Sequence, residues 1–204
     1  MPDEIKDRII EVSLQRFLQN GIRSMTIKKL VEPLGISTKT VYKYFDSKEA
    51  LLTECLHVLY DGYYNEFSGI ISSSDNPVNK LLVLFRGSLG KDYGMSRKFF
   101  HDLNYYYPEL QNKAISNASN NYGTLLVPLV EKGIKEGYFL KYLDPQLALK
   151  GIVTLYTSIT RGEEYRTYKD SPYPLFKNLV ETYIRGMCTE KGIKEIDNNP
   201  HHNE

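Results

Sequence analysis

The sequence predicts an all-α protein in which a small N-terminal head precedes a larger helical body. Apolar residues recur at helical spacing along most of the chain, and no segment shows the apolar and polar alternation of a strand. Capping residues and glycines separate the helical segments from one another. With 204 residues, 41% of them hydrophobic, the chain can bury a sizeable core.

Turn and capping residues mark the ends of the first two helices. Residues 3 to 19 carry apolar side chains at a helical period, and Asn20 and Gly21 then stop this helix. Thr26 can cap a second helix, which Gly35 ends because glycine readily adopts the left-handed conformation found after helices.

A short third helix and a longer fourth helix complete the first quarter of the chain. Ser37 caps the segment TKTVYKYF, which is about two turns long at the usual helical pitch. Ser47 caps the next helix, KEALLTECLHVLY, and places Glu49 near the positive end of its dipole.

The body begins after the head and is divided by a strong loop signal, SSSDNPVN, at residues 72 to 79. Pro128 predicts a kink or a break in one of the later helices. We expect a head over residues 1 to 46, a body over residues 47 to 191 and a polar tail over residues 192 to 204. The helices expected after the loop are Val78 to Lys91, Ser96 to Tyr106, Glu109 to Glu136, Pro145 to Tyr168 and Tyr173 to Lys191.

Charge and composition narrow the functional class. Residues 21 to 48 carry six basic and two acidic side chains, a local charge of +4, although the whole chain carries +1. A basic footprint of this kind suits a protein that binds DNA with one end. Neither a signal peptide nor a membrane-spanning run is present, so we expect a soluble, cytoplasmic protein.

Cofactor and catalytic motifs are missing from the sequence. Cys55 and Cys188 are expected to be buried thiols, and the histidines have no partner at a metal-ligand spacing. We found no phosphate-binding glycine loop, nucleophile elbow or carboxylate pair with metal spacing. The sequence therefore predicts neither a cofactor nor an enzyme.

The most informative segment is TIKKLVEPLGISTKTVYKYFDSKEALL, residues 26 to 52. Two short helices joined by a glycine turn and followed by a capped helix have the layout of a helix-turn-helix. The side chains expected to fold inward are Ile27, Leu30, Val31, Leu34, Ile36, Val41 and Phe45. The side chains left outward or sideways are Thr38, Lys39, Thr40, Tyr42, Lys43 and Tyr44, which suit phosphate oxygens and base edges.

These residues resemble the tetracycline-repressor (TetR) family of bacterial regulators, whose DNA-binding region ends in a pattern like G-[IV]-S-x-x-T-[LV]-Y-x-[HY]-F-x-[SN]-K-E-x-L. Here the pattern reads GISTKTVYKYFDSKEALL. The match extends back through Phe17, Gly21, Thr26, Ile27 and Leu30, so it covers roughly the first quarter of the chain.

Two residues depart from the family pattern. Val31 lies where the family commonly has alanine. Pro33 lies in the last turn of the second helix, where it removes the hydrogen bond to the Lys29 carbonyl and predicts a distorted turn.

The resemblance implies a DNA-binding head of three helices, a helical ligand-binding and dimerisation domain, and a set of DNA contacts. It implies phosphate contacts from Thr26, Tyr42, Tyr44 and Lys48, and base contacts in the major groove from Thr38, Lys39, Thr40 and Lys43. Two alternatives stay open, because the lysines could instead neutralise phosphates or be solvated, and Tyr42 could serve packing alone.

The resemblance further implies a homodimer that binds a pseudo-palindromic operator and is released from it by a small molecule. The segment LVEKGIKEGYFLKYLDPQLAL, residues 129 to 149, is similar to the family's helix end, loop and Asp-Pro helix start. The last two helices would pair with their copies as a four-helix interface. The interface candidates are Leu147, Ile152, Leu155, Ile159, Phe176, Leu179, Val180 and Tyr183, for which a plain core role is an equal alternative.

Aromatic residues suggest where a flat or apolar ligand could bind, since the chain has 17 tyrosines and no tryptophan. The ligand-pocket candidates are Phe99, Phe100, Leu103, Tyr105, Tyr106, Tyr122, Leu126 and Tyr156. The alternative is that these side chains simply fill the core. A DNA-binding architectural protein without a ligand switch also remains open; it would bind without sequence preference.

Overall fold

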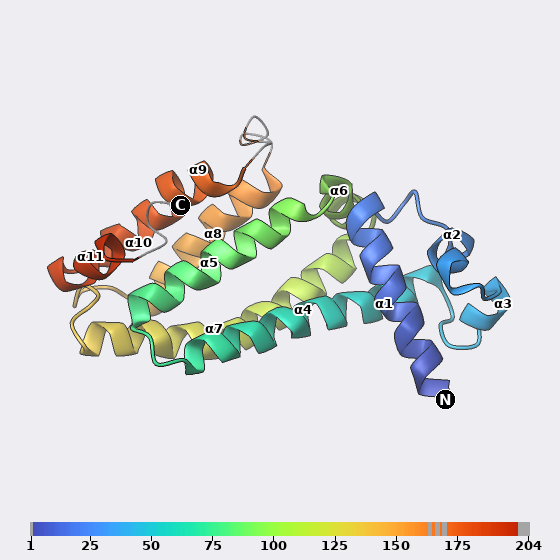
Figure 1. The fold of residues 1–204 in the computed structure, drawn as a ribbon, viewed down its shortest axis with the longest axis horizontal. Helices are drawn as coiled ribbons and strands as arrows, with labels where there is room; N and C mark the ends of the chain where they lie inside the picture. Colours follow the sequence, from blue (N-terminus) through green and yellow to red (C-terminus); the bar gives the residue numbers. More distant parts are fainter. Residues whose placement is uncertain (1, 163–164, 166–167, 169–170, 200–204) are drawn as a thin grey trace. The chain divides into compact units, whose positions relative to one another are not determined.

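The computed structural model describes residues 2 to 162, 165, 168 and 171 to 199. Over these residues the secondary structure is helical, and the one extended pairing is an isolated antiparallel bridge between Phe139 and Cys188 (Figure 1). The chain forms two compact units. Of the described residues, the head unit contains those from 2 to 64 and from 95 to 118, and the body unit contains those from 65 to 94 and from 119 to 199.

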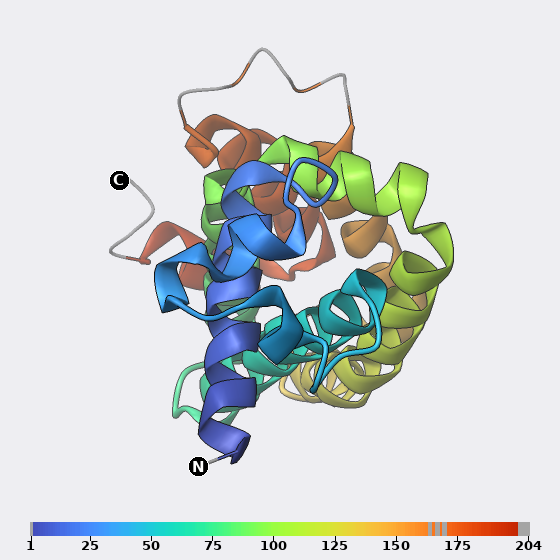
Figure 2. The same ribbon diagram turned by 90° about the vertical axis from the view of Figure 1, so that its right-hand side faces the viewer.

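The head unit combines short helices with the long helix α1 and the first parts of two more long helices, and Figure 2 shows α1, α2 and α3 in blue. Its elements are α1 (Pro2–Asn20), α2 (Ile27–Val31), the 3-10 turn η1 (Glu32–Leu34), α3 (Thr38–Val41), the first part of α4 (Lys48–Ser72), α6 (Arg97–Tyr106) and the first part of α7 (Pro108–Lys135).

The body unit contains the remainder of α4 and α7 together with the C-terminal helices. Its other elements are α5 (Pro77–Gly94), α8 (Pro145–Arg161), α9 (Tyr173–Leu175), the π-helical turn η2 (Phe176–Glu181), α10 (Thr182–Met187) and α11 (Glu190–Asp197). The helix α7 continues through Pro128, so the proline does not break it.

The cores explain why these helices assemble. In the head unit, Phe17, Leu30, Val41 and Leu51 are completely or almost completely buried side chains of one apolar cluster. A separate cluster in the body unit is built mainly from α5, α7, α8 and the C-terminal helices. Burying such side chains stabilises each unit by roughly 1.5 to 3 kcal/mol per large residue.

The expected helix ends are present where glycine or a capping side chain requires them. Gly21, Gly35 and Gly137 have positive φ angles of 82°, 63° and 77°, a conformation that favours glycine after a helix. The Asp144 side chain accepts a hydrogen bond from the Leu147 amide at 2.9 Å and so caps α8.

Pro33 distorts the second helix as expected. The α-helix ends at Val31, and the chain continues as the 3-10 turn η1 because Pro33 has no amide hydrogen for the Lys29 carbonyl. The Gly35 amide then donates to the Glu32 carbonyl at 3.2 Å and closes the turn.

Three expectations about helix ends need correction. The third helix is shorter than TKTVYKYF: α3 ends at Val41 and is followed by turns whose amides bond three or four residues back. The helix expected to reach Tyr168 ends at Arg161, and the residues beyond Gly162 are described only in part.

The third correction concerns the expected helix from Tyr173 to Lys191 and the polar tail over residues 192 to 204. The helix ends at Met187, and a new helix, α11, begins at Glu190. Thr189 caps α11 by accepting from the Gly192 amide at 3.4 Å, and Ile196 is completely buried. Residues 192 to 197 therefore belong to the body unit, whereas residues 200 to 204 lie outside the described residues.

Candidate nucleic-acid interface

The α3 segment, residues 37 to 45, consists of α3 and the turns that follow it and is held by its first residues and by one buried side. The Ser37 hydroxyl accepts from the Thr40 amide at 3.2 Å and lies 3.0 Å from the Thr40 hydroxyl oxygen. Val41 is 0% exposed and Phe45 is 4% exposed, so both side chains anchor the segment in the head core. The apolar side chains of this segment are therefore buried in the core of the head unit.

The opposite side of the same segment faces outward. Thr38, Lys39 and Lys43 are exposed, and 54% of the Tyr42 side chain is exposed. Thr40 is half-buried because its hydroxyl lies against Ser37. The structure therefore brings all four expected base-contacting residues and Tyr42 together on one short element.

The expected phosphate contacts differ in their accessibility. Thr26 is exposed, and its hydroxyl already accepts from the Lys29 amide at 3.3 Å as the cap of α2. Tyr44 is half-buried, with its ring 6.5 Å from that of Phe45. Tyr42 is more open to a phosphate than Tyr44.

Lys48 has a structural partner inside the head unit. Its ammonium donates to the Ile22 carbonyl at 2.6 Å and lies 5.9 Å from the centre of the Phe17 ring. Burial lowers the pKa of Lys48, and the negative charge of Asp102 partly opposes this change. Lys48 therefore fixes the turn after α1, and an additional phosphate contact stays a prediction.

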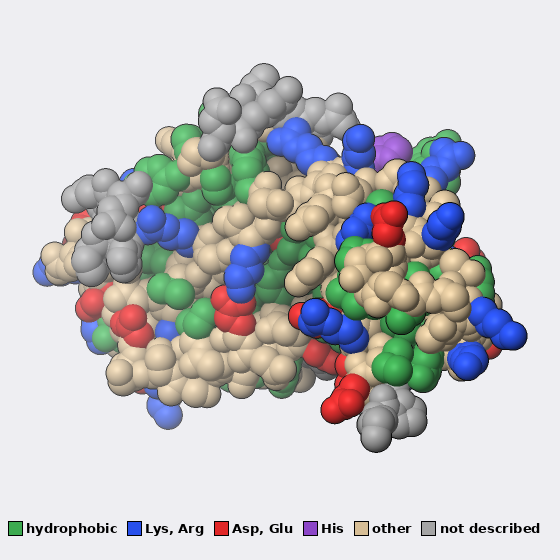
Figure 3. Space-filling model, turned by 45° about the vertical axis from the view of Figure 1, so that its right-hand side comes forward, with side chains coloured by type: hydrophobic (Ala, Val, Ile, Leu, Met, Phe, Trp, Pro, Cys, Tyr) green, Lys and Arg blue, Asp and Glu red, His purple; other side chains and the backbone are tan. Residues whose placement is uncertain are grey.

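Cations gather on the outer surface of the head unit. Figure 3 shows Lys and Arg side chains standing out on the side where α1 to α3 lie. Within the part of the chain that the structure describes, none of Lys28, Lys39 and Lys43 forms an ion pair. An unpaired cation is the group that a DNA phosphate or a guanine edge can use.

Two further kinds of feature, a metal-binding cluster and a membrane-spanning helix, are not found among the described residues. No three His, Cys, Asp or Glu side chains there come together as a metal site would need. No helix described here is long and apolar enough to cross a bilayer.

The eight candidate ligand-pocket residues are divided between the two units. Phe99, Phe100 and Leu103 of α6 are at most 8% exposed and belong to the head core. Tyr105 and Tyr106, at the end of α6, are 72% and 39% exposed. These five side chains therefore belong to the head unit. The periodicity of the sequence could not predict this, because it does not show which helices α6 packs against.

The other three candidates lie in the body unit. Tyr122 and Leu126 line a cavity of about 660 Å³ between α7 and α8, together with Leu149 and Val153. Tyr156 packs against the Phe85 ring at 5.9 Å, and its hydroxyl donates to the Asp92 carboxylate at 2.6 Å. A cavity of this size is in the range that small-molecule sites occupy.

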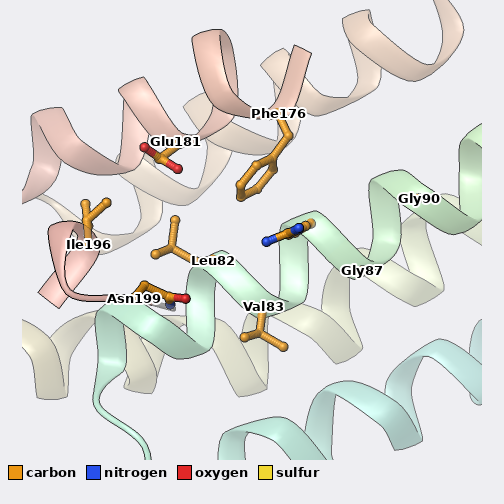
Figure 4. A pocket seen from close by; sticks show the side chains of 9 residues that line it. Leu82, Val83, Gly87, Gly90, Phe176, Glu181, Ile196 and Asn199 are labelled. Carbon is orange, nitrogen blue, oxygen red and sulfur yellow. The ribbon is translucent and has the colours of Figure 1, made fainter. Parts of the chain in front are cut away.

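A second cavity, of about 450 Å³, was not expected from the sequence. Figure 4 shows Phe176 and Glu181 of the π-helical turn reaching toward Leu82 of α5, with Ile196 and Asn199 beside them. Glu181 is 6% exposed and pairs with Lys177 at 3.1 Å. A π-turn is hard to foresee because its spacing matches neither a regular helix nor a strand.

The eight candidate interface residues divide into core and surface. Ile152, Ile159, Phe176 and Val180 are at most 4% exposed and pack inside the body unit. Leu147 is 67% exposed. Leu155, Leu179 and Tyr183 are half-buried, and the Tyr183 hydroxyl donates to the Ala148 carbonyl at 3.0 Å.

Comparisons with known proteins agree with this geometry. The family model of the bacterial regulatory proteins, tetR family, matches residues 9 to 55. The HTH-type transcriptional repressor KstR2 of Mycobacterium tuberculosis (strain H37Rv) is 25% identical over 154 residues, which cover 72% of this chain and 75% of the relative.

Two solved structures share the fold. The fatty acid degradation regulator FadR from Bacillus halodurans has a TM-score of 0.71 and 20% identity, over 89% of this chain and 95% of that chain. The reduced form of E. coli NemR has a TM-score of 0.74 and 16% identity, over 91% of this chain and 97% of that chain. Residues 9 to 55 therefore match the DNA-binding region of the tetR family of bacterial regulatory proteins, and a curated transcriptional repressor is similar over 72% of the chain.

Proposed function

We propose that this regulator is a cytoplasmic, homodimeric repressor that binds a pseudo-palindromic operator and leaves it when a small molecule occupies the body unit. The observation that carries the DNA-binding part is the α3 segment: Val41 is anchored in the core, while Lys39 and Lys43 are exposed on the other side. The name of the relative KstR2, a repressor, supports repression.

In this proposal Thr38, Lys39, Thr40 and Lys43 read bases in the major groove. Lysine can donate to guanine O6 and N7, and threonine can donate or accept at either kind of pair. Thr26, Tyr42, Tyr44 and Lys48 contact phosphates, which position the head unit without reading the sequence. A dimer would place two α3 segments about 34 to 36 Å apart, one helical turn of DNA.

Selection of bound DNA from a random pool tests this proposal. We expect a pseudo-palindrome whose half-sites are about one turn apart. Lys43→Ala should lower affinity for the selected site by roughly 5-fold to 100-fold and relax the base preference at one position. Lys135→Ala, an exposed lysine of α7, is the matched control. Enrichment of no sequence would favour an architectural DNA-binding protein instead.

For the dimer we propose a surface built from the exposed part of α8 and the neighbouring C-terminal helices. Leu147 and the half-buried Leu155, Leu179 and Tyr183 are its candidate contacts. Leu147→Glu should shift sedimentation equilibrium toward the monomer, because a buried, unpaired carboxylate opposes association. Gln146→Glu places the same charge one residue earlier, at an exposed position of α8, and serves as the comparison. An equal shift for both variants would contradict a specific role of Leu147.

For the ligand we propose the cavity between α7 and α8, because it contains Tyr122 and Leu126 and has the volume of a small-molecule site. A ligand there lowers operator affinity only as far as it prefers the body conformation that does not bind DNA. Leu126→Trp should narrow this cavity beside Tyr122 and weaken the response to an inducing compound while leaving operator affinity unchanged. An unaltered response would exclude this cavity.

A further inference from the structure

Outside the helix-turn-helix, the head unit contains an ordered and exposed arginine. We propose that Arg23 is a further phosphate contact of the DNA-binding surface and that α6 holds it in position. This inference rests on the proposed operator binding.

The backbone of the turn before α2 is fixed by one buried carboxylate. Asp102 of α6 is 9% exposed, and its Oδ2 accepts from the Ile22 amide at 2.8 Å and from the Arg23 amide at 2.7 Å. A Cβ at Gly21 would lie 2.9 Å from the Lys98 Cβ, so only glycine allows α6 to come this close. The backbone of Arg23 is therefore set by α6 rather than by the turn alone.

The side chain of Arg23 is ordered by the same helix. Its guanidinium lies 4.4 Å from the centre of the Tyr106 ring and donates to the Tyr106 hydroxyl. Tyr106 is itself supported by Tyr105, with the two ring centres 4.9 Å apart. A guanidinium stacked in this way binds phosphate with less loss of side-chain entropy than a free one, and it can still offer donors to two oxygens.

The surroundings of Arg23 suit an anion. Arg23 is exposed and lies three residues before Thr26, the first expected phosphate contact. Lys28 and Lys29 follow on exposed positions, and the Lys29 ammonium lies 3.5 Å from the Ser24 carbonyl, beside the same turn. Arg23 is therefore continuous with the proposed DNA-binding surface. The phosphate that it would contact belongs to the same duplex DNA that this surface is proposed to bind.

The salt dependence of operator binding tests the proposal. Each phosphate contact contributes about 0.9 to the slope of log K against log salt concentration. Arg23→Gln should therefore reduce the slope by about 0.9 and weaken binding about five-fold at roughly 0.15 M salt, equally for operator and unrelated DNA. The control Lys135→Gln makes the same change of charge on α7 and should leave the slope unchanged.

A double-mutant cycle tests the positioning role of Tyr106. In the Tyr106→Leu background, the loss from Arg23→Gln should be smaller than in the natural protein, because an unstacked arginine has already lost its pre-ordering. An equal loss in both backgrounds would overturn the role of Tyr106. Urea denaturation of each variant checks that the head unit remains folded, and Arg23→Lys supplies a second variant with the charge retained.

The outcomes separate this inference from the proposed function. If the natural protein selects an operator but Arg23→Gln leaves the slope unchanged, Arg23 is not a phosphate contact and the inference fails alone. If the natural protein selects no sequence, the proposed function fails. A reduced slope for both Arg23→Gln and Lys135→Gln would also overturn the inference, because net charge would then account for the effect.

Discussion

Asp102→Asn should destabilise the head unit without changing its size or shape. The Asp102 carboxylate receives two backbone amides, those of Ile22 and Arg23, in a buried position. A hydrogen bond to a charged group contributes about 1.5 to 3 kcal/mol, and a neutral acceptor retains about half of that. The two weakened bonds together give an expected loss of about 1.5 to 3 kcal/mol.

Urea denaturation followed by circular dichroism measures this loss as a lower midpoint at an unchanged m-value. Hydrogen exchange of the Ile22 and Arg23 amides should accelerate in parallel, which locates the effect in the turn after α1. Asn104→Ala, at an exposed position of the same helix, should change stability by less than about 0.5 kcal/mol. A loss that small for Asp102→Asn would refute the claim that its charge holds the turn.

Further predictions concern the thiols, a close helix contact and the lysine at the start of α4. Burial raises the pKa of both Cys55 and Cys188 to about 12, so an aromatic disulfide at about pH 8 should react with neither thiol in the native protein and with both in urea. A Cβ at Gly133 would lie 2.3 Å from the Phe139 ring; Gly133→Ala should therefore lower the thermal midpoint, with a cost of about 1 to 3 kcal/mol. Lys48→Met should lower stability, and a change of about 0.9 in the salt slope of DNA binding would show a phosphate contact as well.

The helix-turn-helix part of the head unit was largely predictable because its signals are local, whereas the sequence assigned α6, which also belongs to this unit, to the body. Ser37 caps α3 by accepting a hydrogen bond from the Thr40 amide, three residues later in the chain. Gly35 ends the 3-10 turn η1, which directly precedes Gly35. Because such contacts join residues only a few positions apart, the sequence pattern is sufficient to predict them. The exception is the shortness of α3, since periodicity does not distinguish an α-helical turn from the tighter turns that follow Val41.

The role of α6 could not be predicted in this way. The bond between Asp102 and the Ile22 amide joins residues 80 positions apart, and no periodic pattern encodes that distance. The aromatic residues of α6 look alike whether they line a cavity or fill a core. The same reasoning explains the C-terminal error, because α11 depends on Gly192, where a Cβ would lie 2.3 Å from the Tyr138 carbonyl oxygen.

Recognition by α3 depends on the head core, because a helix of four residues is not stable alone in water. Val41→Ala removes two buried methyl groups and should cost about 1.5 to 3 kcal/mol of stability. It removes no group that is proposed to touch DNA. If the substitution lowers the free energy of local unfolding of α3, operator affinity should drop although the protein stays folded. The backbone amides of Lys39 and Lys43 should then exchange hydrogen faster. Unchanged affinity at reduced global stability would instead mean that Ser37 and Phe45 hold the α3 segment without Val41.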